Sequence, residues 1–447
     1  MAVLYNLREW NDECLRIIKT DIGGEAMSAK EKTGKKGWKI FLRILLGVLV
    51  VIVAAAAIIT ILNFSSVNSS EKFISQIKKV DMPDQLVPEK DKKDGYYTFR
   101  TDDDLKVMQL TDVHLGGGFL SRAKDKKTLN AVAAMVTAEK PDLVIVTGDI
   151  DFPSPPQSGS VNTKSGARLF ADLMEKLGVY WAPAFGNHDS EAHTYYSRKD
   201  IADFYSNKER YPHCLFQSGP ENVDGYGNYI IKEVNSKGKI VQFFVLLDSG
   251  SYINVDSLVP GSDYDCVHKN QVEWYKKETD KLTAENGGAV PKSLMFFHIP
   301  PKEMLDAYNE YTDNGNENTD RVQYLYGDIE ETDKIVYCSD ENYGLFDAVK
   351  EKKSTKAIFF GHDHVNTASF LYDGIQLSYG LSVDYLAYAD IQYVGPQRGC
   401  TIITVDQKSG YVISQKNYYQ DKYVPVAEKE KVSMKKYRAY MEDKRDK

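Results

Sequence analysis

Two histidines, His362 and His364, stand two positions apart in the stretch GHDHVN, directly after the apolar run 357–360. The chain of 447 residues contains eight histidines, so one predicted strand end uses a quarter of them. Side chains two positions apart on an extended backbone point to the same side, which lets both imidazoles reach one region of space. Because imidazole is a common metal ligand, the pair indicates a metal site.

Four other predicted strands, 105–110, 142–147, 179–185 and 293–297, also stop at Asp, Asn or His, often beside glycine. The polar residues that follow the five strands are Asp112, His114, Asp149, Asn187, His188, His298, His362 and His364. Ligands of α/β sheets bind beyond the carboxyl ends of the strands, so we expect these side chains to converge.

Oxygen and imidazole ligands without cysteine suit Zn, Fe, Mn, Co or Ni. The set is too large for one ion, but two ions that share a bridging aspartate would use it. Such ion pairs, about 3.5–4 Å apart, activate water and hold a phosphoryl group during displacement at phosphorus. Taken singly, each residue has an ordinary reading as a turn former or hydrogen-bond partner, and only the joint pattern predicts metal binding.

In chain order, the blocks D-x-H, G-D, G-N-H-D, H and G-H-x-H resemble the signature of calcineurin-like metallophosphoesterases, from about residue 105 to 370. The words FFHIPP and GHDHVN, with the later pair Arg398-Gly399, look most like the purple-acid-phosphatase-like branch. This resemblance implies a four-layer α/β/β/α sandwich of two mixed sheets. It also implies two divalent metal ions (Mn, Fe or Zn) at the strand ends.

The resemblance also implies a role for each residue. The first metal would be held by Asp112, His114 and His364. The second metal would be held by Asn187, His298 and His362. Asp149 would bridge the two metals. The catalytic pair would be His188 and Asp189. His188 would stabilise or protonate the leaving oxygen, and Asp189 would orient the His188 ring. A metal-bound hydroxide would attack phosphorus.

One position departs from the resemblance. In purple acid phosphatases, a tyrosine three residues after the bridging aspartate ligates ferric iron, and this chain has Phe152 there. Phenylalanine has no oxygen to donate. We therefore expect the ferric site and its purple colour to be absent.

The elements that must position these residues read as an α/β fold with a largely central sheet. Predicted helices at 123–140, 165–177 and 270–282 alternate with the buried strands. The late strands 401–406 and 411–419 have no helix between them, so we expect part of the sheet to be antiparallel.

A run of nineteen uncharged residues, Ile44–Leu62, precedes this domain. At about 1.5 Å per residue it nearly crosses the ~30 Å hydrocarbon core of a membrane. Lys and Arg cluster before the run, which places the N-terminus in the cytoplasm. The run is too long and starts too late for a cleaved signal peptide. The expected parts are a cytoplasmic segment 1–43, a transmembrane helix 44–62, a stalk 63–94, an extracytoplasmic catalytic domain 95–426 and a charged tail 427–447.

The net charge is -8, and because residues 1–62 carry +3 the rest of the chain carries -11, which argues against a nucleic-acid binder. The five cysteines include no CxxC pair, and their spacing leaves disulfide bonding open. The sequence also leaves the oligomeric state open. The leading hypothesis is a membrane-anchored dinuclear phosphatase acting on phosphate monoesters. The alternatives are a phosphodiesterase or pyrophosphohydrolase acting on nucleotides or lipid-linked phosphates, and a non-catalytic receptor with the same fold.

Overall fold

The computed structural model describes residues 29–253, 263–331, 334–388, 398–407, 412–423 and 426. The chain divides into two compact units, residues 1–60 and 61–447. The predicted tail 427–447 and most of the predicted N-terminal segment lie outside the described residues.

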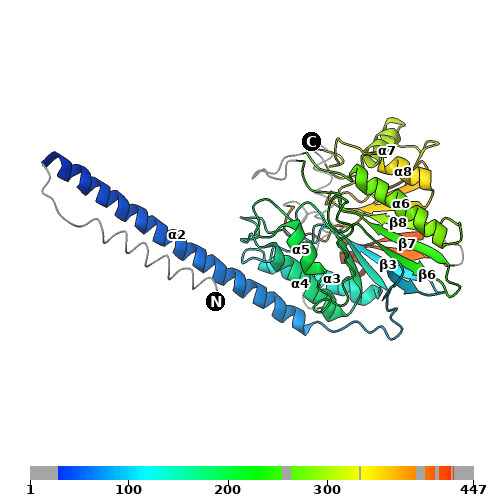
Figure 1. Cartoon of the computed structure of the whole chain (residues 1–447), viewed down its shortest axis with the longest axis horizontal. Helices are drawn as coiled ribbons and strands as arrows, with labels where there is room; N and C mark the ends of the chain where they lie inside the picture. The colour runs from blue at the N-terminus through cyan, green and yellow to red at the C-terminus, as the bar shows by residue number, and fades with distance from the viewer. Residues whose placement is uncertain are drawn as a thin grey trace. The chain divides into compact units, whose positions relative to one another are not determined.

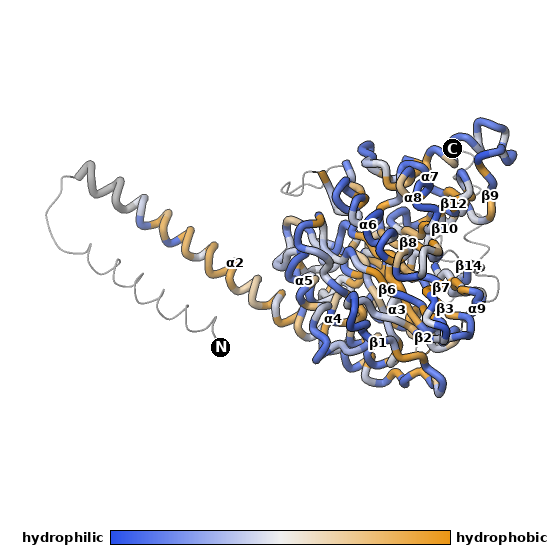
Figure 2. Tube along the Cα trace, turned by 45° about the vertical axis from the view of Figure 1, so that its right-hand side comes forward, coloured by the Kyte–Doolittle hydropathy of each residue, from blue (hydrophilic) through white to orange (hydrophobic). Residues whose placement is uncertain are grey.

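Helix α2 (Ala29–Gln76) contains the predicted membrane segment. Its part from Gly37 to Gln76 is long and apolar enough to cross a membrane, with a mean hydropathy of 3.2 in a window whose residues are all exposed. Figure 2 shows this apolar stretch of the helix in orange. Length and composition therefore fit a membrane span.

The structure differs from the expected stalk at 63–94. Helix α2 continues to Gln76, and one face of its last turns is buried in the compact unit at Ser66, Ser70, Phe73 and Ile74, followed by Ile77 just beyond the helix. These positions recur at the three-to-four-residue spacing of an amphipathic helix, which the Ser-rich composition concealed. The sheet also begins before residue 95, because β1 pairs with β2. The compact unit thus starts at the end of the apolar run.

Two mixed sheets form the centre of this unit. The first has the strand order β1 (Glu89–Lys90), β2 (Tyr97–Arg100), β6 (Tyr229–Val234), β7 (Ile240–Leu246), β8 (Lys292–Phe296), β10 (Thr355–Phe360), β12 (Ile375–Tyr379), β11 (Ser369–Tyr372) and β9 (Val322–Tyr326). The second has the order β14 (Val412–Tyr418), β13 (Gly399–Val405), β3 (Leu105–Leu110), β4 (Leu143–Thr147) and β5 (Trp181–Ala184). As expected, the late strands β13 and β14 pair antiparallel.

Helices cover the outer faces of the sheets, which gives four α/β/β/α layers. Figure 1 shows α3 (Arg122–Glu139), α4 (Thr163–Leu177) and α5 (Arg198–Tyr205) on one side of the strands, and α6 (Lys269–Glu285), α7 (Lys302–Asp313) and α8 (Leu345–Lys352) on the other. A short helix, α9 (Tyr419–Lys422), follows β14. The predicted four-layer fold is confirmed.

Strand β8 shows why the central strands read as continuous apolar runs. Leu294 and Phe296 pack in the core that includes the five-stranded sheet, whereas Met295 and Phe297 pack in the core beneath α6, α7 and α8. Alternate side chains of a strand point to opposite faces, so a strand buried on both faces needs apolar residues at every position.

Candidate metal centre

The predicted ligands converge where the C-terminal ends of five strands meet. Asp112 and His114 follow β3, Asp149 follows β4, and Asn187 follows β5. The remaining histidines follow β8 and β10 of the other sheet. The two sheets are joined at this edge, because Gln109 Nε2 donates to the Phe360 carbonyl at 3.1 Å.

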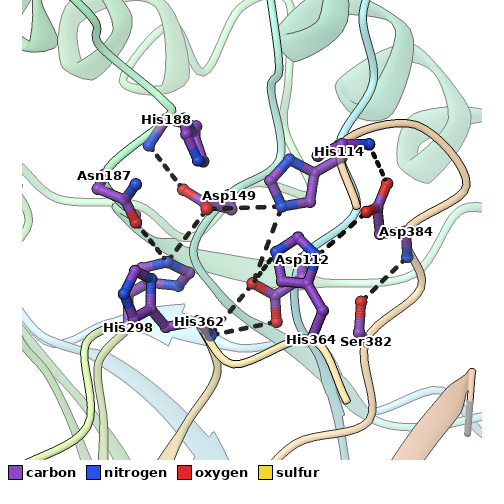
Figure 3. A network of polar contacts seen from close by, with 12 residues as sticks. Asp112, His114, Asp149, Asn187, His188, His298, His362, His364, Ser382 and Asp384 are labelled. Carbon is purple, nitrogen blue, oxygen red and sulfur yellow. Dashed lines mark hydrogen bonds and ion pairs between the residues drawn. The ribbon is translucent and has the colours of Figure 1, made fainter. Parts of the chain in front are cut away.

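Two groups of side chains could each hold an ion, and Asp149 belongs to both. The ligand atoms in each group lie within 4.8 Å of one another; the groups are Asp112, His114, Asp149 and His364, and Asp149, His298 and His362. Asn187 joins the second group, since its Oδ1 lies 3.1 Å from His298 Nε2. Figure 3 shows these side chains facing one another around Asp149. The structure thus brings all seven predicted ligands together.

Several of these buried polar atoms have no hydrogen-bond partner within the described residues. They are both ring nitrogens of His114, Oδ2 of Asp149 and Nε2 of His362. Buried polar atoms are normally paired, because leaving them unpaired costs free energy. Carboxylate oxygens and imidazole nitrogens left in this state are what a divalent cation coordinates, so the residues fit a metal centre.

Four of the seven residues adopt left-handed backbone conformations. Their φ angles are 50° for Asp112 and His114, 53° for Asp149 and 80° for His362. A non-glycine residue pays roughly 1–2 kcal/mol in this region, and such strain concentrates at functional sites. The loops are held in place by backbone bonds, such as that from His114 N to the Asp149 carbonyl at 3.0 Å.

Gly148 shows how closely the loops approach. Its φ is +87°, and a Cβ atom there would lie 2.6 Å from Nδ1 of His298. A side chain would therefore displace a predicted ligand, and only glycine fits.

The carboxylates stabilise positive charge in both halves of the centre. Burial alone would lower the pKa of His298, but Asp149 and Asp112 raise it to about 9. Burial also opposes the charged form of His364, yet its contact with Asp384 raises the pKa to about 10. Burial lowers the pKa of His114 to about 3, which leaves a neutral ring with lone pairs for a cation.

His188 lies at the rim of the centre rather than inside it. Its side chain is 24% exposed, and its Nδ1 lies 2.6 Å from Oε1 of Glu191. Its backbone N–H donates to Asp149 Oδ1 at 2.8 Å. The ring packs against Phe152 with centroids 4.8 Å apart, so the phenylalanine that stands in the tyrosine position faces the site.

The expected role of Asp189 is not what the structure shows. Its carboxylate accepts backbone N–H groups from Asp149 at 2.9 Å, Asp151 at 3.0 Å and Gly186 at 2.8 Å. Asp189 therefore braces two ligand loops, and Glu191 is the acid that contacts His188. His188 and Asp189 lie in a turn, in which the Asp189 carboxylate faces the ligand loops while Glu191, three residues after His188, reaches the ring.

Two residues that support the candidate ligands were not predicted from the sequence. Oδ2 of Asp384 lies 3.1 Å from Nδ1 of His364. Asn187 Nδ2 donates to the Tyr252 hydroxyl at 2.9 Å, which fixes the amide with its oxygen toward His298. Such partners orient metal ligands. Asp384 lies five residues beyond the end of strand β12, which is too far for the strand-end pattern to predict it. No sequence pattern predicts a role for Tyr252.

Sequence comparisons identify the family of this chain. The profile of the calcineurin-like phosphoesterase family matches residues 105–366. Probable inactive purple acid phosphatase 14 of Arabidopsis thaliana is 27% identical over 327 residues, covering 66% of this chain and 74% of the relative. Phosphatase DCR2 of Saccharomyces cerevisiae is 29% identical over 280 residues, covering 58% of this chain and 44% of the relative. The solved structure of a dimetal phosphatase from Danio rerio matches with a TM-score of 0.43 and 13% identity, covering 70% of this chain and 96% of that one.

Proposed function

Because the chain belongs to the calcineurin-like phosphoesterase family, we propose that it hydrolyses phosphate monoesters at a centre for two divalent metal ions. The observation that carries this proposal is the complete set of candidate ligands arranged around Asp149. A chain that had kept the fold for binding alone would be free to lose ligands, and all seven are in place.

In this proposal Asp112, His114 and His364 would hold one ion. Asn187, His298 and His362 would hold the other, and both groups would share Asp149. Two bound ions would supply an activated water and charge neutralisation at the phosphoryl group. Mn, Fe and Zn all suit such a ligand set.

His188 would act on the leaving group. Its Nδ1 is engaged by Glu191, which fixes the ring and leaves Nε2 for the ester oxygen. Proton transfer from Nε2 to that oxygen would accompany cleavage of the bond between phosphorus and oxygen. Because His188 belongs to neither ligand group, it is free for this role.

A second candidate is a non-catalytic protein with the same fold, because the Arabidopsis relative is named as probably inactive. The complete ligand set and the presence of His188 favour the enzyme. A phosphodiesterase or pyrophosphohydrolase would use the same residues and differ only in substrate.

We further propose that residues 44–62 cross the cell membrane, with 1–43 in the cytoplasm and residues 63–447 outside. The uncharged run and the basic residues before it support this orientation.

The test uses the full chain purified in detergent, stripped of metal with a chelator and assayed after addition of Mn²⁺, Zn²⁺ or Fe²⁺. We expect metal-dependent hydrolysis of p-nitrophenyl phosphate exceeding that of bis-p-nitrophenyl phosphate. Faster turnover of the diester would make the protein a phosphodiesterase. Absence of turnover on both esters with every metal would favour the non-catalytic candidate.

A further inference from the structure

The first residue beyond the apolar run, Asn63, is bonded to two loops of the domain. Its Oδ1 accepts the backbone N–H of Phe119 at 2.9 Å, and its Nδ2 donates to the Gly159 carbonyl at 3.0 Å. Both contacts lie within the compact unit 61–447. A membrane that holds 44–62 therefore ends within a residue or two of these loops.

The next turns of α2 extend this attachment. Ser66, which is buried, donates its hydroxyl to the Gly118 carbonyl at 2.7 Å. One helical turn further, Glu71 forms an ion pair with Arg168 of α4. With Phe73 in the core, the helix from Asn63 onward is a fixed part of the domain rather than a tether.

The loops attached to Asn63 are continuous with the candidate metal centre. The loop 116–119 begins two residues after His114. The segment that follows His188 reaches the other loop, since Tyr195 N donates to the Val161 carbonyl at 3.0 Å. Two of the five ligand-bearing loops thus run from the centre to the place where the apolar run ends.

Three large side chains are exposed around this attachment: Phe64 at 68%, Leu120 at 52% and Tyr195 at 74%. Backbone contacts place two of them beside the loop that contains Gly159. Leu120 N donates to the Ser158 carbonyl at 3.2 Å, and Tyr195 N donates to the Val161 carbonyl. We call Phe64, Leu120 and Tyr195 the apolar rim. Tyrosine and other large side chains are typical of the interface between membrane and water.

Exposed cations stand beside the rim. Arg122 and Lys124 follow Leu120 in the first turn of α3. Basic side chains at a membrane surface attract anionic headgroups, each by about 1 kcal/mol. Apolar side chains next to basic ones are the pattern of a surface that rests on a bilayer.

We propose that the apolar rim lies in the headgroup layer of the membrane that holds residues 44–62, and that the enzyme acts on the phosphate ester of a lipid in that bilayer. The proposal rests on the proposed phosphatase function and on the membrane span. Water adds to phosphorus, the bond between phosphorus and the lipid oxygen breaks, and that oxygen takes up a proton. The lipid alcohol stays in the bilayer and inorganic phosphate leaves.

The position of the rim can be measured without activity. The full chain with Cys14→Ser and Cys266→Ser receives a single Leu120→Cys or Val290→Cys substitution, is labelled with an environment-sensitive fluorophore and is placed in liposomes. Val290 is the matched control because it is 49% exposed and precedes β8, at the end of that strand opposite His298. We expect lipid-borne quenchers to quench the label at 120 and not at 290. Equal quenching at both positions would overturn the placement.

The substrate class is tested with the full chain in liposomes that contain phosphatidic acid, with release of inorganic phosphate as the readout. We expect the rate to follow the mole fraction of phosphatidic acid in the bilayer rather than its bulk concentration. Leu120→Asp combined with Tyr195→Asp should lower this rate by about tenfold or more, since charge removes the rim from the interface. The rate of the double variant on soluble p-nitrophenyl phosphate should stay within about twofold of the parent rate. Val290→Asp should change neither the phosphatidic acid rate nor the p-nitrophenyl phosphate rate by more than about twofold.

Hydrolysis of p-nitrophenyl phosphate without hydrolysis of phosphatidic acid at any mole fraction would overturn this inference and leave the proposed function standing. So would a double variant that behaves like Val290→Asp. Failure on both substrates with every metal would instead count against the proposed function itself.

Discussion

Two clusters of carboxylates in this chain could be mistaken for each other. Asp91, Asp94 and Glu285 lie close enough together to hold a metal ion, as the residues around Asp149 do. In that cluster, however, Lys232 supplies the positive charge, with Nζ 2.6 Å from Asp94 and 3.1 Å from Asp91. The ammonium is 1% exposed and occupies the space between the acids.

The cluster around Asp149 has imidazoles in place of a lysine, and among the described residues it keeps ligand atoms without a hydrogen-bond partner, including Nδ1 of His114 and Nε2 of His362. The difference teaches that proximity of acids does not define a metal centre. An internal cation that satisfies them argues for a structural role, and orphaned ligand atoms argue for a metal.

The largest effect is expected from Asp149→Ala, which removes the bridge shared by both ligand groups. We expect loss of both metals and a fall in rate of at least about a thousandfold, roughly 4 kcal/mol. Metal content by elemental analysis and phosphatase rate are the measurements. Retention of two ions per chain would show that the bridging role is wrongly assigned.

His188→Ala separates catalysis from metal binding. The residue belongs to neither ligand group, so we expect two metals to remain while the rate falls by about 10²–10⁴-fold, as for loss of a general acid. Loss of one metal in elemental analysis would instead make His188 a ligand.

Lys232→Met tests the other cluster. It leaves the buried carboxylate of Asp94 without its cation, and breaking a buried ion pair in this way costs about 3–5 kcal/mol of unfolding free energy. Metal content should stay at two, because the centre around Asp149 is untouched. Lys199→Met, which breaks the exposed pair with Asp203, is the control and should leave the unfolding free energy nearly unchanged, because exposed ion pairs contribute little. A third metal or an unchanged stability in Lys232→Met would contradict the comparison.

The same contrast shows what the sequence could and could not predict. The ligand blocks were visible because each follows a buried strand, and strands of a sheet bring their ends together whatever lies between them. Strands β3, β4, β8 and β10 were found within a residue or two at each end, since strands buried on both faces read as continuous apolar runs.

Elements without such runs were missed. Strands β9 and β11 and the amphipathic end of α2 are stabilised by contacts between residues far apart in the chain. The two strands lack a long apolar run, and the serines of α2 conceal its helical spacing. The same holds for the exchange of roles between Asp189 and Glu191, which depends on how the loop turns after His188. The Lys232 cluster was not predicted either, because three separate segments supply its residues: Asp91 with Asp94, Lys232, and Glu285.

Glu191→Gln tests that exchange. The variant keeps a hydrogen-bond partner for His188 and removes the charge, so we expect two metals and a rate loss of roughly tenfold. The loss should be larger for alkyl phosphates than for p-nitrophenyl phosphate, since a poor leaving group depends more on its proton. The matched control is Glu175→Gln, which alters the similar pair with His213 far from the centre. Equal losses on both substrates would assign Glu191 a purely structural role.

The smallest effect on rate is expected at Glu233, which is a buried acid outside both ligand groups and has no lysine partner among the described residues. Burial raises its pKa to about 8, with repulsion from Asp104 and Asp142 adding to it. Gln407 donates to Oε1, and Oε2 has no hydrogen-bond partner among the described residues. The folded state therefore holds this proton at a pH where the unfolded chain has released it.

This difference in proton binding fixes the sign of the pH dependence. Because the folded pKa lies above the ordinary value of 4.5, the contribution to stability is complete below pH 4.5 and is lost as the pH rises through about 8. The unfolding free energy should fall by up to about 1.4 kcal/mol per pH unit in this window through Glu233 alone. In Glu233→Gln that part of the slope should vanish, so the variant should gain stability relative to the parent as the pH rises from 5 to 8. Urea unfolding in detergent at several pH values measures it, and parallel pH profiles for the two proteins would show that Glu233 is already ionised in the folded state.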